Sequence, residues 1–91
     1  MHEAYGVAAF RSRQNVLWFE QVLRRHGVPV SVVSTPRNIS MGCGLSVRFP
    51  LSRTADVRRA LHEVNTMNLI GLYRAEYDGN RLRVTPLRQR N

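Results

Sequence analysis

Two helix-like segments, each flanked by strand-like runs, follow one another in a chain of only 91 residues. The strand-like runs lie at 5–10, 30–35, 45–49 and 69–77, and each is apolar, β-branched or alternating in polarity. The helix-like segments lie at 13–26 and after Pro50. This β-α-β-β-α-β order predicts an α+β, ferredoxin-like sandwich, in which an antiparallel sheet carries both helices on one face.

The first helix has sequence signals at both of its ends. We expect Ser12 to cap its first turn, Gly27 to adopt the left-handed conformation after its last turn, and Pro29 to prevent its continuation. The helical period places one group of side chains on the face toward the sheet, namely Val16, Phe19, Val22, Leu23 and His26.

The second helix is expected to begin at a cap supplied by Ser52 or Thr54. Asp56 suits its positive end, and Arg59 is placed to pair with Glu63 one turn later. Its expected core face consists of Val57, Ala60, Leu61 and Val64.

The C-terminal part predicts an additional strand. Residues 78–80 read Asp-Gly-Asn, a hairpin turn signal, and the alternating run 81–85 follows. This fifth strand is expected to cover the edge formed by the fourth, which leaves the second strand as the other edge. We therefore expect one domain over 1–91, with a core at 5–74, an added hairpin strand at 75–86 and a tail at 87–91.

The charged residues and the single cysteine restrict the function classes. The net charge is +8, and all fourteen basic residues are arginines. This charge favours an anionic partner, but the scattered arginines and the absence of lysine also fit a coding bias, so nucleic acid is not favoured. One cysteine cannot form an internal disulfide, which predicts a reducing, cytoplasmic compartment. No apolar run reaches the ~20 residues of a membrane span, and no metal-ligand cluster is apparent.

The connection at 36–44 contains the features most typical of chemistry. It is long for a hairpin loop, and Gly42 and Gly44 leave the backbone beside Cys43 without side chains. Exposed N–H groups and nearby guanidinium groups favour a thiolate, and Arg37 and Arg48 are the nearest cations in sequence. Ser40 is a further hydrogen-bond donor in the same loop. The alternative interpretation is that the cysteine is a small buried apolar side chain.

The segment from residue 35 to residue 49, read with the strand and helix before it, resembles the selenium/sulfur carrier protein-like family of small bacterial domains. The resemblance covers about residues 5–74, and Met41 stands where a small residue is expected. The matching motif positions are Thr35, Pro36, Arg37, Ser40, Gly42, Cys43, Gly44, Leu45, Arg48 and Phe49.

The resemblance implies that Cys43 carries a covalent sulfur or selenium atom, with no other cofactor and no metal. It implies a carrier rather than a complete enzyme, served by donor and acceptor proteins of sulfur or selenium metabolism. In the carrier hypothesis Arg37, Ser40, Gly42, Gly44 and Arg48 would stabilise the charged adduct.

Two alternatives stay open at this point. The sheet face without helices, to which alternation assigns Ser31, Val33, Ser46 and Arg48, could bind an anionic small ligand or RNA. The chain could instead be a dimerisation domain that associates through a sheet edge.

Overall fold

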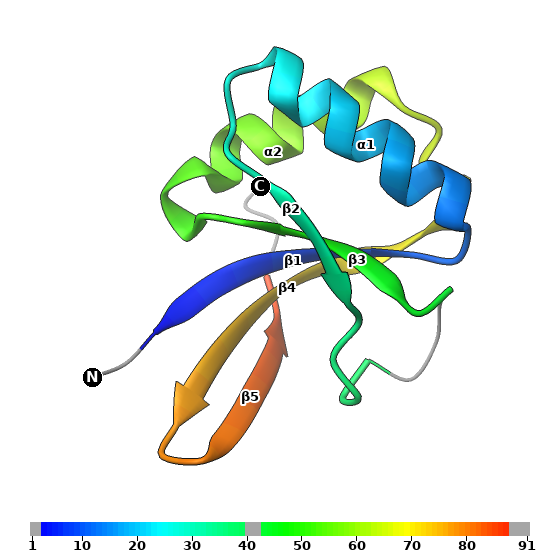
Figure 1. Cartoon of the computed structure of the whole chain (residues 1–91). Helices are drawn as coiled ribbons and strands as arrows, with labels where there is room; N and C mark the ends of the chain where they lie inside the picture. Colours follow the sequence, from blue (N-terminus) through cyan, green and yellow to red (C-terminus); the bar gives the residue numbers. More distant parts are fainter. Residues whose placement is uncertain (1–2, 40–42, 88–91) are drawn as a thin grey trace.

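The computed structural model describes residues 3–39 and 43–87. Figure 1 shows the elements, which are β1 (Ala4–Phe10), α1 (Arg13–Arg25), β2 (Ser31–Ser34), β3 (Leu45–Phe49), α2 (Thr54–Ala60), β4 (Leu69–Asp78) and β5 (Arg81–Pro86). Three short 3-10 turns, η1 (Leu51–Arg53), η2 (Leu61–Glu63) and η3 (Thr66–Asn68), flank α2 and precede β4. No helix within the described residues is long and apolar enough to cross a membrane.

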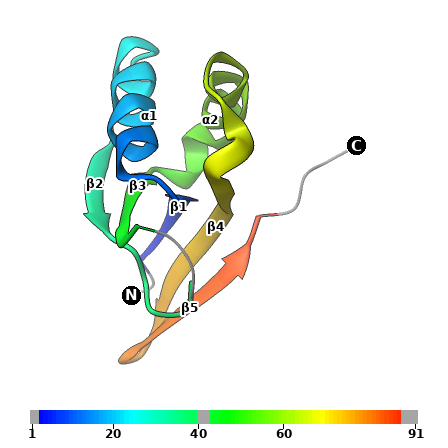
Figure 2. The ribbon, with the colours of Figure 1, turned by 90° about the vertical axis from the view of Figure 1, so that its right-hand side faces the viewer.

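The strands form one antiparallel sheet in the order β2-β3-β1-β4-β5. Both helices lie on the same face of this sheet, as Figure 2 shows with α1 and α2 side by side above the strands. The expected α+β architecture and the antiparallel sheet are therefore confirmed. As expected, β5 pairs with β4 and β2 forms the opposite edge.

The helix ends differ from several expectations. Ser12 is the residue before α1, but its hydroxyl makes no capping hydrogen bond. Gly27 has the expected left-handed conformation, with φ of 76°. At α2 the expected serine or threonine cap was wrong, because Arg53 occupies the cap position and the Thr54 hydroxyl donates to the Leu51 carbonyl at 2.6 Å.

The predicted pair between Arg59 and Glu63 was also wrong. The α-helix ends at Ala60 and continues only as the 3-10 turn η2, so Glu63 is not placed one α-helical turn below Arg59. Arg59 contacts Asp56 instead. Glu63 contacts His26, which follows the last residue of α1, and thereby links the ends of the two helices.

Asp56 provides a test of how this helix end is stabilised. A hydrogen bond from Arg53 at 2.6 Å, with the charges of Arg53 and Arg59, holds the pKa of Asp56 below its ordinary value of 3.8, although burial opposes this shift. A lowered folded-state pKa adds stability above the unfolded value, and that stability is lost as the pH falls through the folded value. We expect Asp56→Asn to lower the thermal midpoint at pH 7. When the pH drops below 3.8, the thermal midpoint of the variant should fall less than that of the original chain. Asp78→Asn, at the last residue of β4, is the control, and an equal effect of both variants would contradict this account.

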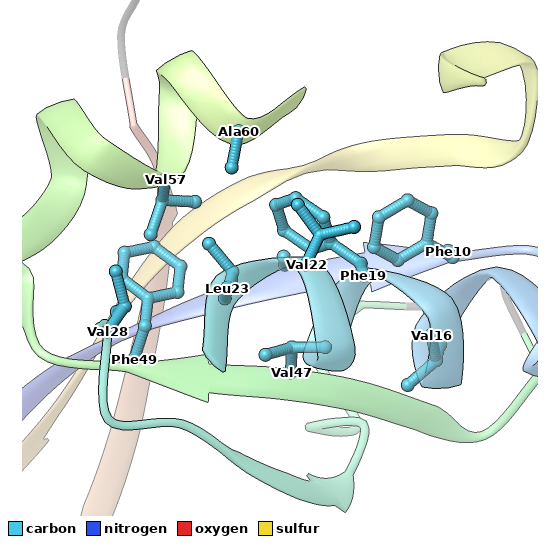
Figure 3. Packing of buried hydrophobic residues seen from close by; sticks show 11 residues of the cluster. Phe10, Val16, Phe19, Val22, Leu23, Val28, Val47, Phe49, Val57 and Ala60 are labelled. Atoms are coloured by element: carbon cyan, nitrogen blue, oxygen red, sulfur yellow. The ribbon is translucent and has the colours of Figure 1, made fainter. Parts of the chain in front are cut away.

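The main core lies between the helices and the sheet (Figure 3). The aromatic rings of Phe10 and Phe19 meet edge to face, with centroids 5.5 Å apart. Phe49 of β3 lies over Gly6 of β1, its partner in the strand register. A β-carbon at position 6 would lie 2.2 Å from the Phe49 ring, so glycine is required there by packing.

The opposite face of the sheet has its own small core. Val7, Ala9 and Ala75 are buried there, and Ile39 from the β2–β3 loop packs against them with 8% of its surface exposed. Figure 2 shows the loop passing below the sheet toward β5. The face that carries no helix is therefore covered in part by the loop, which the alternation of polarity did not indicate.

Candidate functional site

A closed neck holds the two ends of the β2–β3 loop together. The Thr35 N–H donates to the Gly44 carbonyl at 2.9 Å, and the Thr35 and Ser46 hydroxyls share a hydrogen bond of 2.7 Å. Gly44 has φ of 88°, a left-handed conformation that residues with a β-carbon disfavour, so glycine suits this position. Two other predicted site residues, Ser40 and Gly42, lie outside the described residues.

Cys43 lies on the helix-covered side of the sheet, beside the end of β1. Its backbone N–H donates to the Phe10 carbonyl at 3.3 Å, and its side chain packs against the edge of the main core. The thiol donates to the Leu45 carbonyl at 3.6 Å and is partly exposed. The sulfur is thus neither fully buried nor projecting on an isolated loop.

Arg37 is exposed on the other limb of the same loop. After the neck, the chain makes a tight turn in which the Ile39 N–H donates to the Pro36 carbonyl at 3.0 Å. This turn directs Ile39 to the opposite face of the sheet. No described contact joins Arg37 to Cys43, although both lie within two residues of the neck.

Arg48 lies on the opposite face of the sheet from the thiol. Its guanidinium carbon is 4.0 Å from the centre of the Tyr5 ring, and its Nη2 is 3.5 Å from a carboxylate oxygen of Glu3. These contacts engage Arg48 with the start of β1. Within the described residues no contact joins Arg48 to Cys43, so the role of Arg48 at the thiol stays a prediction.

Sequence reasoning missed the segment between β1 and α1. The backbone N–H of Cys43 is bonded to the carbonyl of Phe10, the last residue of β1, and the chain continues from there through Arg11 and Ser12 to Arg13, the first residue of α1. Both arginines are exposed, and neither makes a side-chain hydrogen bond or ion pair within the described part of the chain. The sequence contained a signal for this neighbourhood. If 4–10 pairs antiparallel with 45–49, the residue that follows Phe10 comes to lie near the residue that precedes Leu45.

The first turn of α1 adds backbone donors to this environment. The first N–H groups of a helix have no partner within the helix, and Ser12 does not cap them with its hydroxyl. The Arg11 N–H donates to the Asn68 carbonyl at 2.7 Å, and the Asn68 side chain donates to Asn15 at 3.0 Å. These bonds fix the entry to α1 close to Cys43. The positive end of a helix and two cations favour an anion at this position.

The largest described hollow is elsewhere. It has a volume of about 600 Å³ and lies between α2 and β4, lined by Leu61, His62, Val64, Leu69, Leu72 and Leu87 among others. Cys43 does not line it, so we do not assign the thiol chemistry to it. Within residues 3–39 and 43–87, no three histidine, cysteine, aspartate or glutamate side chains gather in a way that could hold a metal ion.

Ile39 is expected to anchor the loop that carries the site. Truncation of a buried isoleucine to alanine typically costs 2–5 kcal/mol. Because Ile39 lies at the margin of its cluster, we expect Ile39→Ala to lower the free energy of unfolding by about 2 kcal/mol, near the lower end of that range. Urea denaturation measures this change, and Met67→Ala, at a residue of η3 that is 80% exposed, is the control. A loss no larger than that of the control would mean that the loop is not anchored through Ile39.

The comparisons with known proteins give one match. Residues 5–73 match a protein family described as "Putative Se/S carrier protein-like". The matched range includes β1 from its second residue, α1, β2, the whole of the loop and its neck, β3 and α2, and it ends within β4. No curated protein and no solved structure matched the chain.

Proposed function

Since the chain belongs to the Se/S carrier protein-like family, we propose that Cys43 carries a sulfur or selenium atom between a donor and an acceptor protein. The observation that carries this proposal is the position of the thiol. It is partly exposed and is bonded through its backbone to the end of β1, immediately before the first turn of α1. Cys43 is also the only cysteine of the chain, so it is the one thiol that can hold such an adduct.

Loading is a thiol–persulfide exchange without net oxidation. The Cys43 thiolate attacks the outer sulfur of a donor persulfide, a new sulfur–sulfur bond forms, and the donor leaves as its thiolate. The proton released from the Cys43 thiol is taken up by that leaving thiolate or by solvent. In the reverse sense, an acceptor thiolate attacks the outer sulfur and Cys43 leaves. The absence of a second cysteine in the chain requires that this acceptor be external.

The surroundings of the thiol suit the charged adduct. Arg11 and Arg13 flank the entry to α1, and the uncapped N–H groups of its first turn are donors for an anion. Arg37 is exposed close to the neck, so a change in its side-chain torsions would direct its guanidinium toward the adduct. The loop residues Ser40, Gly42 and Gly44 complete the proposed set. When the adduct forms, the thiol gives up its hydrogen bond to the Leu45 carbonyl.

The fold and the compartment form part of the same proposal. A strand order of 2-3-1-4, with helices after the first and third strands, supports assignment to the ferredoxin-like class, with β5 as an addition. An unpaired reactive thiol is maintained most easily in a reducing compartment, which supports the cytoplasm. Transfer of the adduct rather than turnover of a substrate makes the chain a carrier.

Intact-mass spectrometry tests this function directly. The full chain is incubated with glutathione persulfide and then separated from it under non-reducing conditions. We expect a species heavier by one sulfur atom, which returns to the original mass after addition of excess thiol. Failure to form any adduct on the folded chain would overturn the proposal.

A further inference from the structure

The two helices do not cover the whole width of the five-stranded sheet. Neighbouring strands lie ~4.8 Å apart and packed helices about 10 Å apart, so two helices cover about four strands. Helix α1 packs over β1, β2 and β3. In Figure 2 the end of β5 extends beyond the helix layer on the side of α2. The hollow between α2 and β4 lies at this uncovered margin of the sheet.

The wall of this hollow is mostly aliphatic, and its burial is incomplete. Leu61 and Val64 begin and follow η2, Leu69 and Leu72 belong to β4, and Leu87 follows β5. All five side chains pack against the main core but stay partly exposed, whereas the core side chains of α1 are fully buried. The Leu87 N–H donates to the Leu72 carbonyl at 2.8 Å, which fixes the wall on the β5 side. An apolar occupant would complete the burial of this wall.

The ionisable residues of the described lining are both basic. Arg58 of α2 and His62 of η2 line the hollow together with Thr66, and no aspartate or glutamate is among the described lining residues. His62 and Thr66 are exposed and therefore lie at its mouth, while Arg58 is half-buried. A guanidinium group has five N–H donors, so Arg58 can bind a carboxylate in addition to the interaction that it already has. A guanidinium binds a carboxylate through two parallel hydrogen bonds.

We propose that this hollow binds an apolar carboxylic acid, with the hydrocarbon body between α2 and β4 and the carboxylate at Arg58. The volume of about 600 Å³ is within the range of about 300–1,000 Å³ that is typical of ligand sites. A small hydrophilic anion would leave the aliphatic wall exposed to water, and a neutral hydrocarbon would not use the donors of Arg58. An amphipathic acid satisfies both parts of the lining.

This site is separate from the thiol chemistry. Cys43 does not line the hollow, and Leu87 lies outside residues 5–73, which match the carrier family. The wall on the β5 side therefore belongs to the part of the chain that follows the matched range. Binding of an acid at this hollow neither requires nor excludes the transfer of sulfur at Cys43.

A heteronuclear NMR titration of the full chain with octanoate, below the concentration at which it forms micelles, tests the proposal. Two further probes separate the parts of the ligand, because acetate has the carboxylate without the body and 1-octanol has the body without the charge. We expect octanoate to shift the amide signals of the lining residues, among them Leu61, Leu72 and Leu87. The affinity for 1-octanol should be roughly 10-fold lower, as expected for the loss of hydrogen bonds to a charged group, and acetate should shift none of these signals.

A pair of neighbouring variants tests the role of the guanidinium group. Arg58→Gln should weaken octanoate binding roughly 10-fold and leave the binding of 1-octanol unchanged. Arg59→Gln is the matched control, because it removes the same charge from the next residue of α2, which does not line the hollow. Leu87→Gln places a polar group in the aliphatic wall and should weaken octanoate and 1-octanol alike. Circular dichroism verifies that each variant is folded, and Leu87→Gln decides alone if Arg58→Gln is not.

Three results would overturn the proposal. The first is the absence of octanoate shifts at the lining residues, and the second is 1-octanol that binds as tightly as octanoate. The third is a folded Arg58→Gln with the same octanoate affinity as Arg59→Gln, or, where Arg58→Gln is unfolded, a folded Leu87→Gln that binds as the original chain does. None of these results bears on persulfide loading of Cys43, which is measured separately by mass.

Discussion

Replacing Cys43 with serine is expected to abolish sulfur loading completely while leaving the fold intact. The substitution removes the only thiol of the chain, and a serine hydroxyl does not attack a persulfide under these conditions. The Cys43 side chain contributes only partly buried contacts at the edge of the core, so the loss of stability should be below about 1 kcal/mol. Intact-mass spectrometry after treatment with glutathione persulfide measures the loading, and urea denaturation measures the stability. An equal mass gain on Cys43→Ser would place the reactive group elsewhere.

The cations around the thiol should change the rate of loading rather than its extent. Arg37→Gln, and the pair Arg11→Gln with Arg13→Gln, each remove positive charge close to the proposed adduct. Exposed charges of this kind contribute a few tenths to about 1 kcal/mol, so each variant should load roughly 2- to 5-fold more slowly. Arg81→Gln is the matched control for Arg37→Gln, because it removes the same charge from β5, the strand at the opposite edge of the sheet from β2, and no described contact joins Arg81 to Cys43. Equal rates for Arg37→Gln and Arg81→Gln would remove Arg37 from the site.

The segments of regular structure could be predicted because their signals are local. Gly27 and Pro29 end the first helix, and the alternation at 45–49 matches β3 at both of its ends. The second helix was predicted less well, because its apolar spacing continues through Val64 although the α-helix stops at Ala60. A pattern of side chains does not distinguish an α-helical turn from the 3-10 turn that replaces it.

The surroundings of Cys43 could be predicted only in part, because they depend on contacts between distant segments. Sequence proximity selected Arg37 and Arg48 as the cations of the site. Arg48 instead contacts Tyr5 on the other face of the sheet, while the backbone bond from Cys43 to Phe10 joins the cysteine to the end of β1, two residues before α1 begins at Arg13. The position of Ile39 was missed for a related reason. An isolated apolar residue in a polar loop carries no periodicity, so only the three-dimensional structure shows what it covers.

Gly6 is the backbone position at which the sheet is expected to tolerate least change. The Phe49 ring occupies the space above it, and an alanine β-carbon would lie 2.2 Å from Cε2 of that ring. Phe49 is only 1% exposed and is enclosed by the main core, so the ring cannot move aside without displacing its neighbours. Overpacking of this kind typically costs 1–3 kcal/mol, and we expect Gly6→Ala to lie near about 3 kcal/mol.

Two further variants separate this packing effect from a general effect of alanine. Gly71→Ala makes the same substitution in β4, where the nearest atoms belong to the half-exposed Tyr73 ring at 3.3 Å, which can shift slightly. Its free energy of unfolding should therefore change by less than about 1 kcal/mol. Combining Gly6→Ala with Phe49→Leu should cost less than the sum of the two single changes, because the smaller side chain vacates the space that the new methyl group needs. Urea denaturation of the four variants measures this coupling, and strict additivity would show that Phe49 does not determine the requirement for glycine at position 6.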